Sequence, residues 1–173
     1  MNSNAIFCEI FTPLALNLNK ELYKTLPEDT IGEKIRKQRL LHGLEKEKFC
    51  EMINTEEKSL VLWESHKIIP VPKSIKKICD LFNLPLDYFG EYYSLYYNHP
   101  EKLFLEWKNR NSYSYKKCVS ILECSESTII NFINGKYGMS YEMYLKMKKV
   151  GIFWKIIIIS LSLKLYALLS TYL

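Results

Sequence analysis

Apolar residues recur at helical spacing from residue 30 onward, and polar or glycine-containing breaks divide them into short segments. The first segment starts at Thr30 and stops at Gly43, where a glycine suits the left-handed turn that ends many helices. Two further amphipathic segments follow, with only about three or four residues in which to turn. The inward positions of these two segments are Phe49, Cys50, Ile53, Leu60 and Trp63. This pattern predicts a helix-turn-helix.

The residues after this motif predict the rest of a small helical domain. Pro70 and Pro72 interrupt the pattern, because proline lacks a backbone N–H and breaks a helix interior. A fourth helix is then marked by apolar residues at Ile75, Ile78, Leu81 and Phe82. Residues 84–89 predict a brief fifth element that closes the domain.

The same pattern returns 69 residues later in the chain. At this offset Ile35 corresponds to Phe104 and Trp63 corresponds to Phe132, and the other predicted core positions also meet apolar or aromatic residues. Few positions are identical, although Lys67 and Lys136 are one such pair. A structural pattern that recurs at a fixed period predicts two small helical domains in tandem.

Composition supports this helical interpretation. The chain has 173 residues, of which 48% are hydrophobic and 25% charged, so it can bury a core and is neither disordered nor of low complexity. With 6 glycines and 6 prolines it is short of the turns that a many-stranded sandwich needs. We therefore predict an all-α fold. The expected divisions are an N-terminal arm at 1–29, a helix-turn-helix domain at 30–90, a tyrosine-rich connector at 91–100, a second helix-turn-helix domain at 101–153 and a hydrophobic tail at 154–173.

Four tyrosines mark the connector between the two predicted domains. Tyr92, Tyr93, Tyr96 and Tyr97 fall along one broad stripe of a helix. We expect this stripe to pack one domain on the other. Stacking on single-stranded bases is less favoured, because proteins that use it combine aromatic residues with a basic groove.

Cysteine usage indicates a reducing compartment. The five cysteines form no CxxC pair, and most lie in apolar periodic stretches, as expected for small core residues. The N-terminal apolar stretch has no basic segment before it and is interrupted by Glu9 and Pro13, so we expect no secretory signal. These features predict a cytoplasmic protein.

Residues 30–90 resemble the Cro/C1 (XRE) family of helix-turn-helix regulators, which have the lambda-repressor-like fold. The matching residues are Thr30, Ile31, Gly32, Ile35, Arg36 and Arg39, then Leu44, Glu47, Phe49 and Cys50, and finally Leu60, Trp63, Glu64 and Pro70. Residues 101–153 resemble a second, more divergent member. The resemblance implies two tandem lambda-repressor-like bundles and a sequence-specific, double-stranded DNA-binding transcription regulator, a repressor of phage or mobile-element type.

In the second domain, the residue types fit DNA recognition. Ser114 and Ser125 can cap the two helices of the motif, and Ser127 and Asn131 can hydrogen-bond base edges. Glu126 can accept from a cytosine amino group, while Lys136 and Tyr137 lie where such domains grip the DNA backbone. The predicted DNA-binding residues of this domain are Ser114, Tyr115, Lys116, Ser125, Glu126, Ser127, Thr128, Asn131, Asn134 and Lys136.

The first domain departs from the family pattern. Glu45 replaces the usual capping residue, and Glu56 and Glu57 would repel phosphates at the start of the third helix. Basic residues that could still bind the DNA backbone are Arg36, Lys37, Arg39, Lys46, Lys58 and Lys67. The predicted DNA-binding residues of this domain are Lys46, Glu57, Lys58 and Lys67. A protein–protein role for its third helix is the competing hypothesis.

Other features favour structural roles. We expect Trp63 and Phe132 in the core and Glu64 bonded within its own domain. No histidine has a second ligand at the next helical turn, and no catalytic motif occurs, so we expect no metal, no cofactor and no enzymatic activity.

Partners follow from charge and from the tail. The net charge of +5 permits a polyanion such as double-stranded DNA. The tail is long enough to span a bilayer, but Lys155 and Lys164 oppose insertion, so we favour a buried segment or a homodimer contact over membrane attachment. The main alternative function is a protein-interaction adaptor, antitoxin-like or antirepressor, built from degenerate helix-turn-helix modules. A membrane-tethered regulator is a third possibility.

Overall fold

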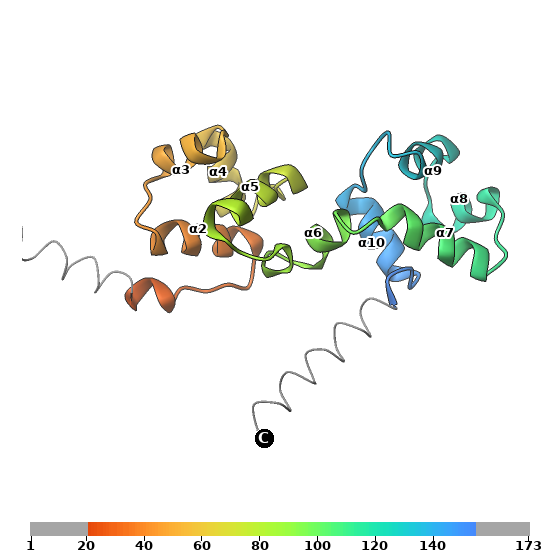
Figure 1. Cartoon of the computed structure of the whole chain (residues 1–173), viewed down its shortest axis with the longest axis horizontal. Helices are drawn as coiled ribbons and strands as arrows, with labels where there is room; N and C mark the ends of the chain where they lie inside the picture. The colour runs from red at the N-terminus through yellow and green to blue at the C-terminus, as the bar shows by residue number, and fades with distance from the viewer. Residues whose placement is uncertain (1–20, 155–173) are drawn as a thin grey trace, which may run out of the picture. The chain divides into compact units, whose positions relative to one another are not determined.

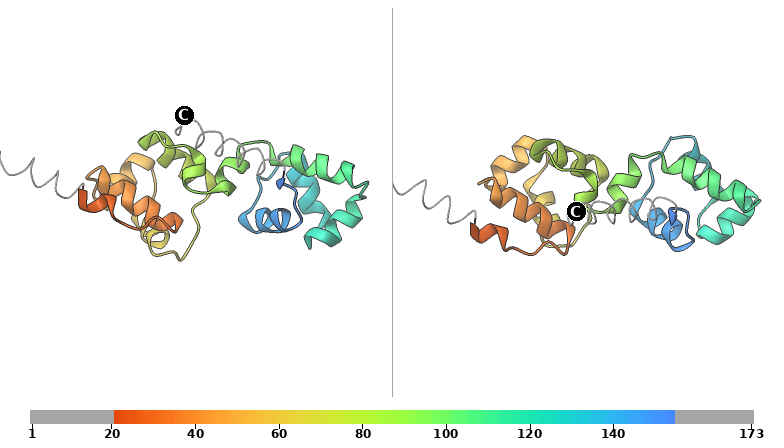
Figure 2. Two further views of the ribbon diagram at one scale, coloured as in Figure 1. Left: turned by 90° about the horizontal axis from the view of Figure 1, so that it is seen from below. Right: turned by 60° about the horizontal axis from the view of Figure 1, so that its bottom comes forward.

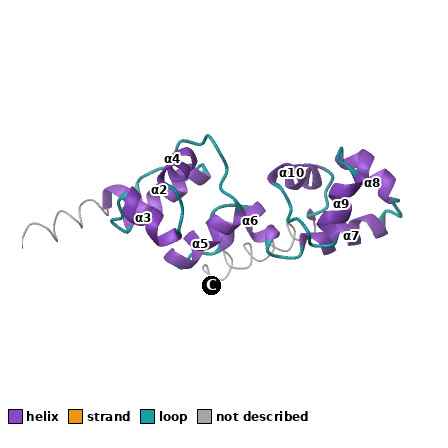
Figure 3. Ribbon diagram, turned by 90° about the horizontal axis from the view of Figure 1, so that it is seen from above, coloured by secondary structure: helices purple, strands orange, loops and turns teal. Residues whose placement is uncertain are grey.

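The computed structural model describes residues 21–154, and over that range the protein is all-α, with helices and loops but no strand (Figure 3). The predicted all-α class is confirmed. The segments 1–20 and 155–173, which hold most of the predicted N-terminal arm and hydrophobic tail, lie outside the described residues. The chain divides into two compact units, Met1–Tyr93 (unit 1) and Ser94–Leu173 (unit 2) (Figure 1).

Unit 1 is built from short helices. They are α2 (Ile31–Leu41), α3 (Lys46–Ile53), α4 (Glu57–Glu64), α5 (Pro72–Phe82) and the 3-10 turn η1 (Leu86–Tyr88). Helix α2 begins at a capping box, in which the Thr30 hydroxyl accepts from the backbone N–H of Glu33 and the Glu33 carboxylate accepts from that of Thr30. Helix α6 (Glu91–Tyr96) starts in unit 1 and ends in unit 2.

Unit 2 repeats the helices of unit 1 at a constant offset. Its helices are α7 (Pro100–Arg110), α8 (Tyr115–Leu122), α9 (Glu126–Ile133) and α10 (Tyr141–Lys149). Each begins 69 residues after its counterpart among α2 to α5, which confirms the register predicted from the sequence. The packing pairs repeat as well: α2 with α4 and α7 with α9, α3 with α4 and α8 with α9, and α3 with α5 and α8 with α10. Both views in Figure 2 show the helices of each unit gathered in their own cluster.

Each unit encloses an apolar core at corresponding positions. Ile35 and Leu60 are fully buried in unit 1, as are Phe104 and Ile129 in unit 2. Trp63 and Phe132 are both only 4% exposed, so their predicted place in the core is confirmed. The core of unit 1 includes a stacked pair of Phe49 and Phe82, and that of unit 2 an edge-on pair of Phe104 and Phe132. This burial, more than helix propensity, stabilises helices of eight to eleven residues.

The structure corrects one expectation for the basic residues of α2. Arg39 is buried and paired with Glu64, so its guanidinium is not available to a DNA phosphate. Lys37 is also largely buried, since its ammonium donates to the carbonyl of Leu26 and lies 3.4 Å from Glu28. Arg36 remains exposed. The predicted bonding of Glu64 within its own domain is confirmed.

The tyrosines of the connector have different surroundings. Tyr92 and Tyr93 are buried, and the Tyr93 hydroxyl donates to the carbonyl of Pro70 in unit 1. Tyr96 packs against Gly138 in unit 2, where its hydroxyl occupies the space that a β-carbon would need. That this stripe packs one domain on the other stays a prediction.

Three of the four cysteines within residues 21–154 are core residues, and Cys124 is half-buried. Cys50, Cys79 and Cys118 are free and buried, as expected, and burial raises the pKa of the Cys79 thiol to about 11. Cys8 lies outside the described residues. Across residues 21–154, no helix combines the length and the apolar character needed to cross a membrane.

Candidate nucleic-acid interface

Three serines cap the helices that surround the α8–α9 turn of unit 2. The hydroxyl oxygens of Ser114, Ser125 and Ser140 accept from the third backbone N–H of α8, α9 and α10 respectively, at 3.1–3.2 Å. The predicted caps at Ser114 and Ser125 are confirmed. Ser140 was missed, although a serine just before a new helical period is a recognisable start signal.

These caps leave the remaining N–H groups of each first turn directed out of the helix. The helix dipole adds a partial positive charge there, so each N-terminus favours an anion. The turn between α8 and α9 has three residues and begins at Glu123, which adopts a left-handed conformation with φ of 48°. The N-termini of α8 and α9 thus belong to one short motif.

The outer face of α9 is polar in its first half. Ser125, Ser127 and Thr128 are exposed, and the Ser125 hydroxyl lies 2.8 Å from both other hydroxyls. Asn131, one turn further along, is half-buried. On the opposite side the fully buried Ile129 anchors the helix. The helix therefore presents hydroxyl and amide groups from a fixed position.

The segment after α9 folds back on the helix. The backbone N–H groups of Lys136 and Tyr137 donate to the carbonyl of Asn131 at 2.9 and 3.3 Å, helped by Gly135 with φ of 68°. The Lys136 ammonium lies 5.6 Å from the ring centroid of Tyr137, and both side chains are exposed. A cationic group is thereby held beside the polar face of α9.

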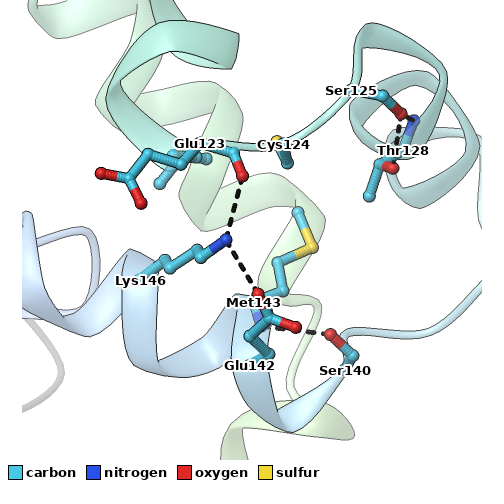
Figure 4. A pocket seen from close by; sticks show the side chains of 9 residues that line it. Glu123, Cys124, Ser125, Thr128, Ser140, Glu142, Met143 and Lys146 are labelled. Carbon is cyan, nitrogen blue, oxygen red and sulfur yellow. Dashed lines mark hydrogen bonds and ion pairs between the residues drawn. The ribbon is translucent and has the colours of Figure 1, made fainter.

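Two neighbouring depressions lie between α9 and α10. One encloses about 310 Å³ and includes Ser125, Thr128, Ser140 and Lys146 in its wall (Figure 4). The other encloses about 340 Å³ and is lined by Ser127, Thr128, Asn131, Tyr137, Ser140 and other residues. Thr128 and Ser140 line both, so the polar surface of α9 continues onto the start of α10.

Lys146 supplies a charge to the first depression, and Glu142 balances it. The Lys146 ammonium donates to the Glu123 carbonyl and to the Glu142 carboxylate, at 2.9 Å each (Figure 4). The hydrogen bond between Lys146 and Glu142 raises the pKa of Lys146 and lowers that of Glu142. The pair is mutually neutralised, so Lys146 contributes less positive potential than Lys136.

The predicted DNA-binding residues of unit 2 reach the surface together. Nine of the ten are exposed, and Asn131 is half-buried. Tyr115 begins α8, and the ammonium of Lys108 on α7 lies 4.6 Å from the centroid of its ring. Lys116, the next residue of α8, is exposed. Glu126 is exposed in the first turn of α9, and Asn134 caps its C-terminus.

The corresponding surface of unit 1 is chemically different. Its N-cap residues are Glu45, Glu56 and Val71, and none of them makes a side-chain capping bond. Carboxylates therefore lie at the starts of α3 and α4, where unit 2 has serine hydroxyls, and a valine lies at the start of α5. The predicted contacts Glu57, Lys58 and Lys67 are exposed and Lys46 is half-buried. No observation separates these four from ordinary surface residues.

The charge balance also differs between the units. Residues 94–154 carry nine Lys and Arg against five Asp and Glu, whereas residues 21–93 carry twelve against thirteen. The described part of unit 2 is thus basic, while that of unit 1 is close to neutral. Over residues 21–154 no group of three or more His, Cys, Asp or Glu side chains could hold a metal ion.

Comparison with protein-family models, with curated proteins and with solved structures finds no match for this chain.

Proposed function

We propose that the chain is a sequence-specific, double-stranded DNA-binding transcription regulator in which unit 2 carries the DNA interface. The observation that carries this proposal is the exposed polar first half of α9, which begins at a serine cap three residues after the end of α8, a helix that also begins at a serine cap. Such an arrangement suits a helix-turn-helix, in which the second helix enters the major groove and the first abuts phosphate.

The dimensions and the chemistry agree with this role. An α-helix with side chains is about 10–12 Å in diameter and the major groove is about 12 Å wide. The Asn131 amide can form a bidentate pair with adenine, and Ser127 can bond to several bases. Lys116 and Lys136 can neutralise phosphates on either side.

The resemblance to the Cro/C1 family supports the same function and adds a direction of control. On that basis we propose that the regulator is a repressor of phage or mobile-element type that acts in the cytoplasm.

Binding of the full chain to a random-sequence duplex at low salt tests this proposal by fluorescence anisotropy. We expect non-specific affinity of micromolar order or better. Ser125→Glu places in unit 2 the residue that unit 1 has at the corresponding Glu56, and it should weaken binding more than tenfold by repelling phosphate. The matched control is Glu56→Ser, which should cause no loss.

Loss of the cap and gain of the charge must be separated in this test. Ser125→Ala removes only the capping bond, worth about 1 kcal/mol of stability, and introduces no charge. It should leave more affinity than Ser125→Glu at equal helix content by circular dichroism. Absence of any duplex binding at low salt, or equal binding by Ser125→Glu and wild type, would contradict the proposal.

The second candidate function is a protein-interaction adaptor. It is favoured by unit 1, where Glu56 and Glu57 occupy the start of α4 and Val61 is exposed. An adaptor of this kind need not bind duplex at low salt, so the same anisotropy measurement distinguishes the two functions.

A further inference from the structure

The two units share one lysine that makes the same hydrogen bond in each. Lys77 of α5 and Lys146 of α10 are 69 residues apart, so they correspond in the repeat. The Lys77 ammonium donates to the carbonyls of Ile53 and Asn54, at 2.7 and 3.2 Å. The Lys146 ammonium donates to the carbonyl of Glu123, the counterpart of Asn54, at 2.9 Å (Figure 4). Each lysine therefore joins α5 or α10 to the turn of the helix-turn-helix in the same unit.

Few other side chains are shared between the units. Between residues 31–84 and 100–153, four positions are identical at the offset of 69: Lys48 and Lys117, Glu57 and Glu126, Lys67 and Lys136, and Lys77 and Lys146. The residues next to the shared lysine differ, since Ile78 corresponds to Met147. A lysine that is present with the same contact in two such divergent units indicates that the turn requires this bond.

The turn has two features that an ammonium group stabilises. Asn54 and Glu123 both have φ of 48°, a left-handed conformation that is unfavourable for a residue with a β-carbon. The last carbonyls of a helix also lack an intrahelical partner and lie at the negative end of the helix dipole. A lysine that donates to these carbonyls satisfies them and is attracted by the dipole, so it stabilises the turn in this conformation.

The direction of α9 depends on this turn. Ser125, the cap of α9, follows Glu123 by only two residues. Lys146 holds the Glu123 carbonyl against α10, and α10 packs on α8, so the path from α8 to α9 is fixed from behind. The Lys146 side chain is 29% exposed and its ammonium also binds Glu142, so its charge is already balanced within unit 2.

We propose that Lys146 is a positioning residue of the DNA interface, whose ammonium fixes the α8–α9 turn against α10 and thereby the approach of α9 to the duplex. Lys77 fixes the corresponding turn of unit 1. The hold of each lysine on its turn is independent of nucleic acid, whereas the effect on duplex binding rests on the proposed function of unit 2.

Amide hydrogen exchange of the full chain, followed by NMR without DNA, tests the hold on the turn. The variant combines Lys146→Met with Glu142→Gln, because this pair of changes leaves no unpaired carboxylate and keeps the net charge of the wild type. The Cys124 N–H, which donates to the Val119 carbonyl at 3.3 Å, should exchange at least tenfold faster. A hydrogen bond from a charged donor is worth about tenfold or more in such a local opening equilibrium.

Three further variants serve as controls. Glu142→Gln alone keeps the lysine and should leave exchange at Cys124 nearly unchanged. Lys149→Met removes an exposed lysine from the same helix and should likewise have no effect there. Lys77→Met should accelerate exchange at Thr55, the counterpart of Cys124 in unit 1, and leave Cys124 as in the wild type.

Fluorescence anisotropy with a duplex tests the effect on α9. The variant with both Lys146→Met and Glu142→Gln should bind about tenfold more weakly than the wild type, at a temperature where circular dichroism shows both proteins folded. Reduced stability alone would not cause this loss. The slope of log K against log salt should not change, because no phosphate contact is removed and the net charge is the same. Lys77→Met should bind like the wild type.

Four results would overturn the proposal. They are unchanged exchange at Cys124 in the double variant, equal acceleration by Lys149→Met, faster exchange with wild-type duplex affinity, and a reduced salt slope, which would mean that Lys146 itself contacts DNA. A wild type that binds no duplex would contradict the proposed function and with it the role of Lys146 in binding. Exchange at Cys124 and Thr55 would still decide whether the two lysines hold their turns.

Discussion

The guanidinium of Arg39 donates two hydrogen bonds to the carboxylate of Glu64, with Nε 2.8 Å from Oε1 and Nη2 3.3 Å from Oε2. A third bond runs from Nη1 to the carbonyl of Leu44, so one side chain joins α2, the end of α4 and the segment before α3. The side chains are only 6% and 9% exposed. The corresponding residues of unit 2 are Lys108 and Ile133, and Ile133 cannot accept such a bond.

Arg39→Met should therefore destabilise unit 1 strongly. It leaves the Glu64 carboxylate buried without its partner, which typically costs about 3–5 kcal/mol. The matched variant Lys108→Met removes only an ammonium over the Tyr115 ring, worth about 1 kcal/mol or less. Urea unfolding measures both, and the double variant Arg39→Met with Glu64→Leu should recover part of the loss. Similar losses in the two single variants would contradict this role of the ion pair.

Gly32→Ala should also destabilise unit 1. A β-carbon on Gly32 would collide with the backbone carbonyl of Trp63 and lie 2.8 Å from Nδ1 of His66. Because a backbone atom cannot move aside as a side chain can, we expect a loss of about 1–3 kcal/mol. Thermal unfolding measures it. Glu101→Ala, at the corresponding position of α7, is the control and should change stability little.

Two substitutions in unit 2 should separate base recognition from backbone binding. Asn131→Ala should cost about 1–3 kcal/mol at one base pair of the selected site and relax preference there. Lys136→Ala should weaken binding to all sequences alike and reduce the slope of log K against log salt by about one. The measurement is anisotropy over a salt series, on sites selected from a random pool.

The control for these variants is Lys48→Ala, an exposed lysine on α3 that pairs with Glu51. It should leave both preference and salt slope unchanged. If Lys136→Ala behaves like Lys48→Ala, the Lys136 ammonium does not contact DNA.

The carboxylate of Glu28 should make the stability of unit 1 pH-dependent. The Tyr88 hydroxyl donates to Glu28 at 2.6 Å and, with the charge of Lys37, holds the pKa of that carboxyl below its ordinary value of 4.5. The ionised Glu28 carboxylate contributes to the free energy of unfolding above its pKa in the unfolded chain. This contribution is lost as the pH falls through the lower pKa of Glu28 in the folded protein.

Glu28→Gln should accordingly lose less stability than wild type between pH 7 and pH 3. At pH 7 the free energies of unfolding of wild type and Glu28→Gln should differ by about 1 kcal/mol. The difference is small because the Glu28 side chain is 38% exposed, so water competes with Tyr88 for hydrogen bonds to its carboxylate. Urea unfolding across this range tests the expectation. Parallel pH profiles for the two proteins would show that Glu28 makes no such contribution.

Local patterns in the sequence were sufficient for the helices, the register and two of the caps. Ile35 and Phe104 could be aligned because helical periodicity depends only on neighbours in sequence, and Ser114 and Ser125 cap groups three residues away. All-α packing and the buried Trp63 follow from the same periodicity.

Contacts between distant segments could not be predicted in this way. The burial of Arg39 depends on Glu64, 25 residues later, and the bond from Tyr88 to Glu28 spans 60 residues. DNA contact by either unit stays a prediction from the sequence.

The equal spacing of the helices has a practical consequence for protein engineering. Because α3 and α8, and likewise α4 and α9, begin one repeat apart and are joined by turns of equal length, residues 56–63 and 125–132 can be exchanged, provided that Glu64 stays in unit 1 to pair with Arg39. A transplant between the units needs no linker redesign, and buried residues of like character, such as Leu60 and Ile129, meet the recipient core. Chimeras of this kind can move a surface property from one half of the chain to the other while the scaffold stays the same.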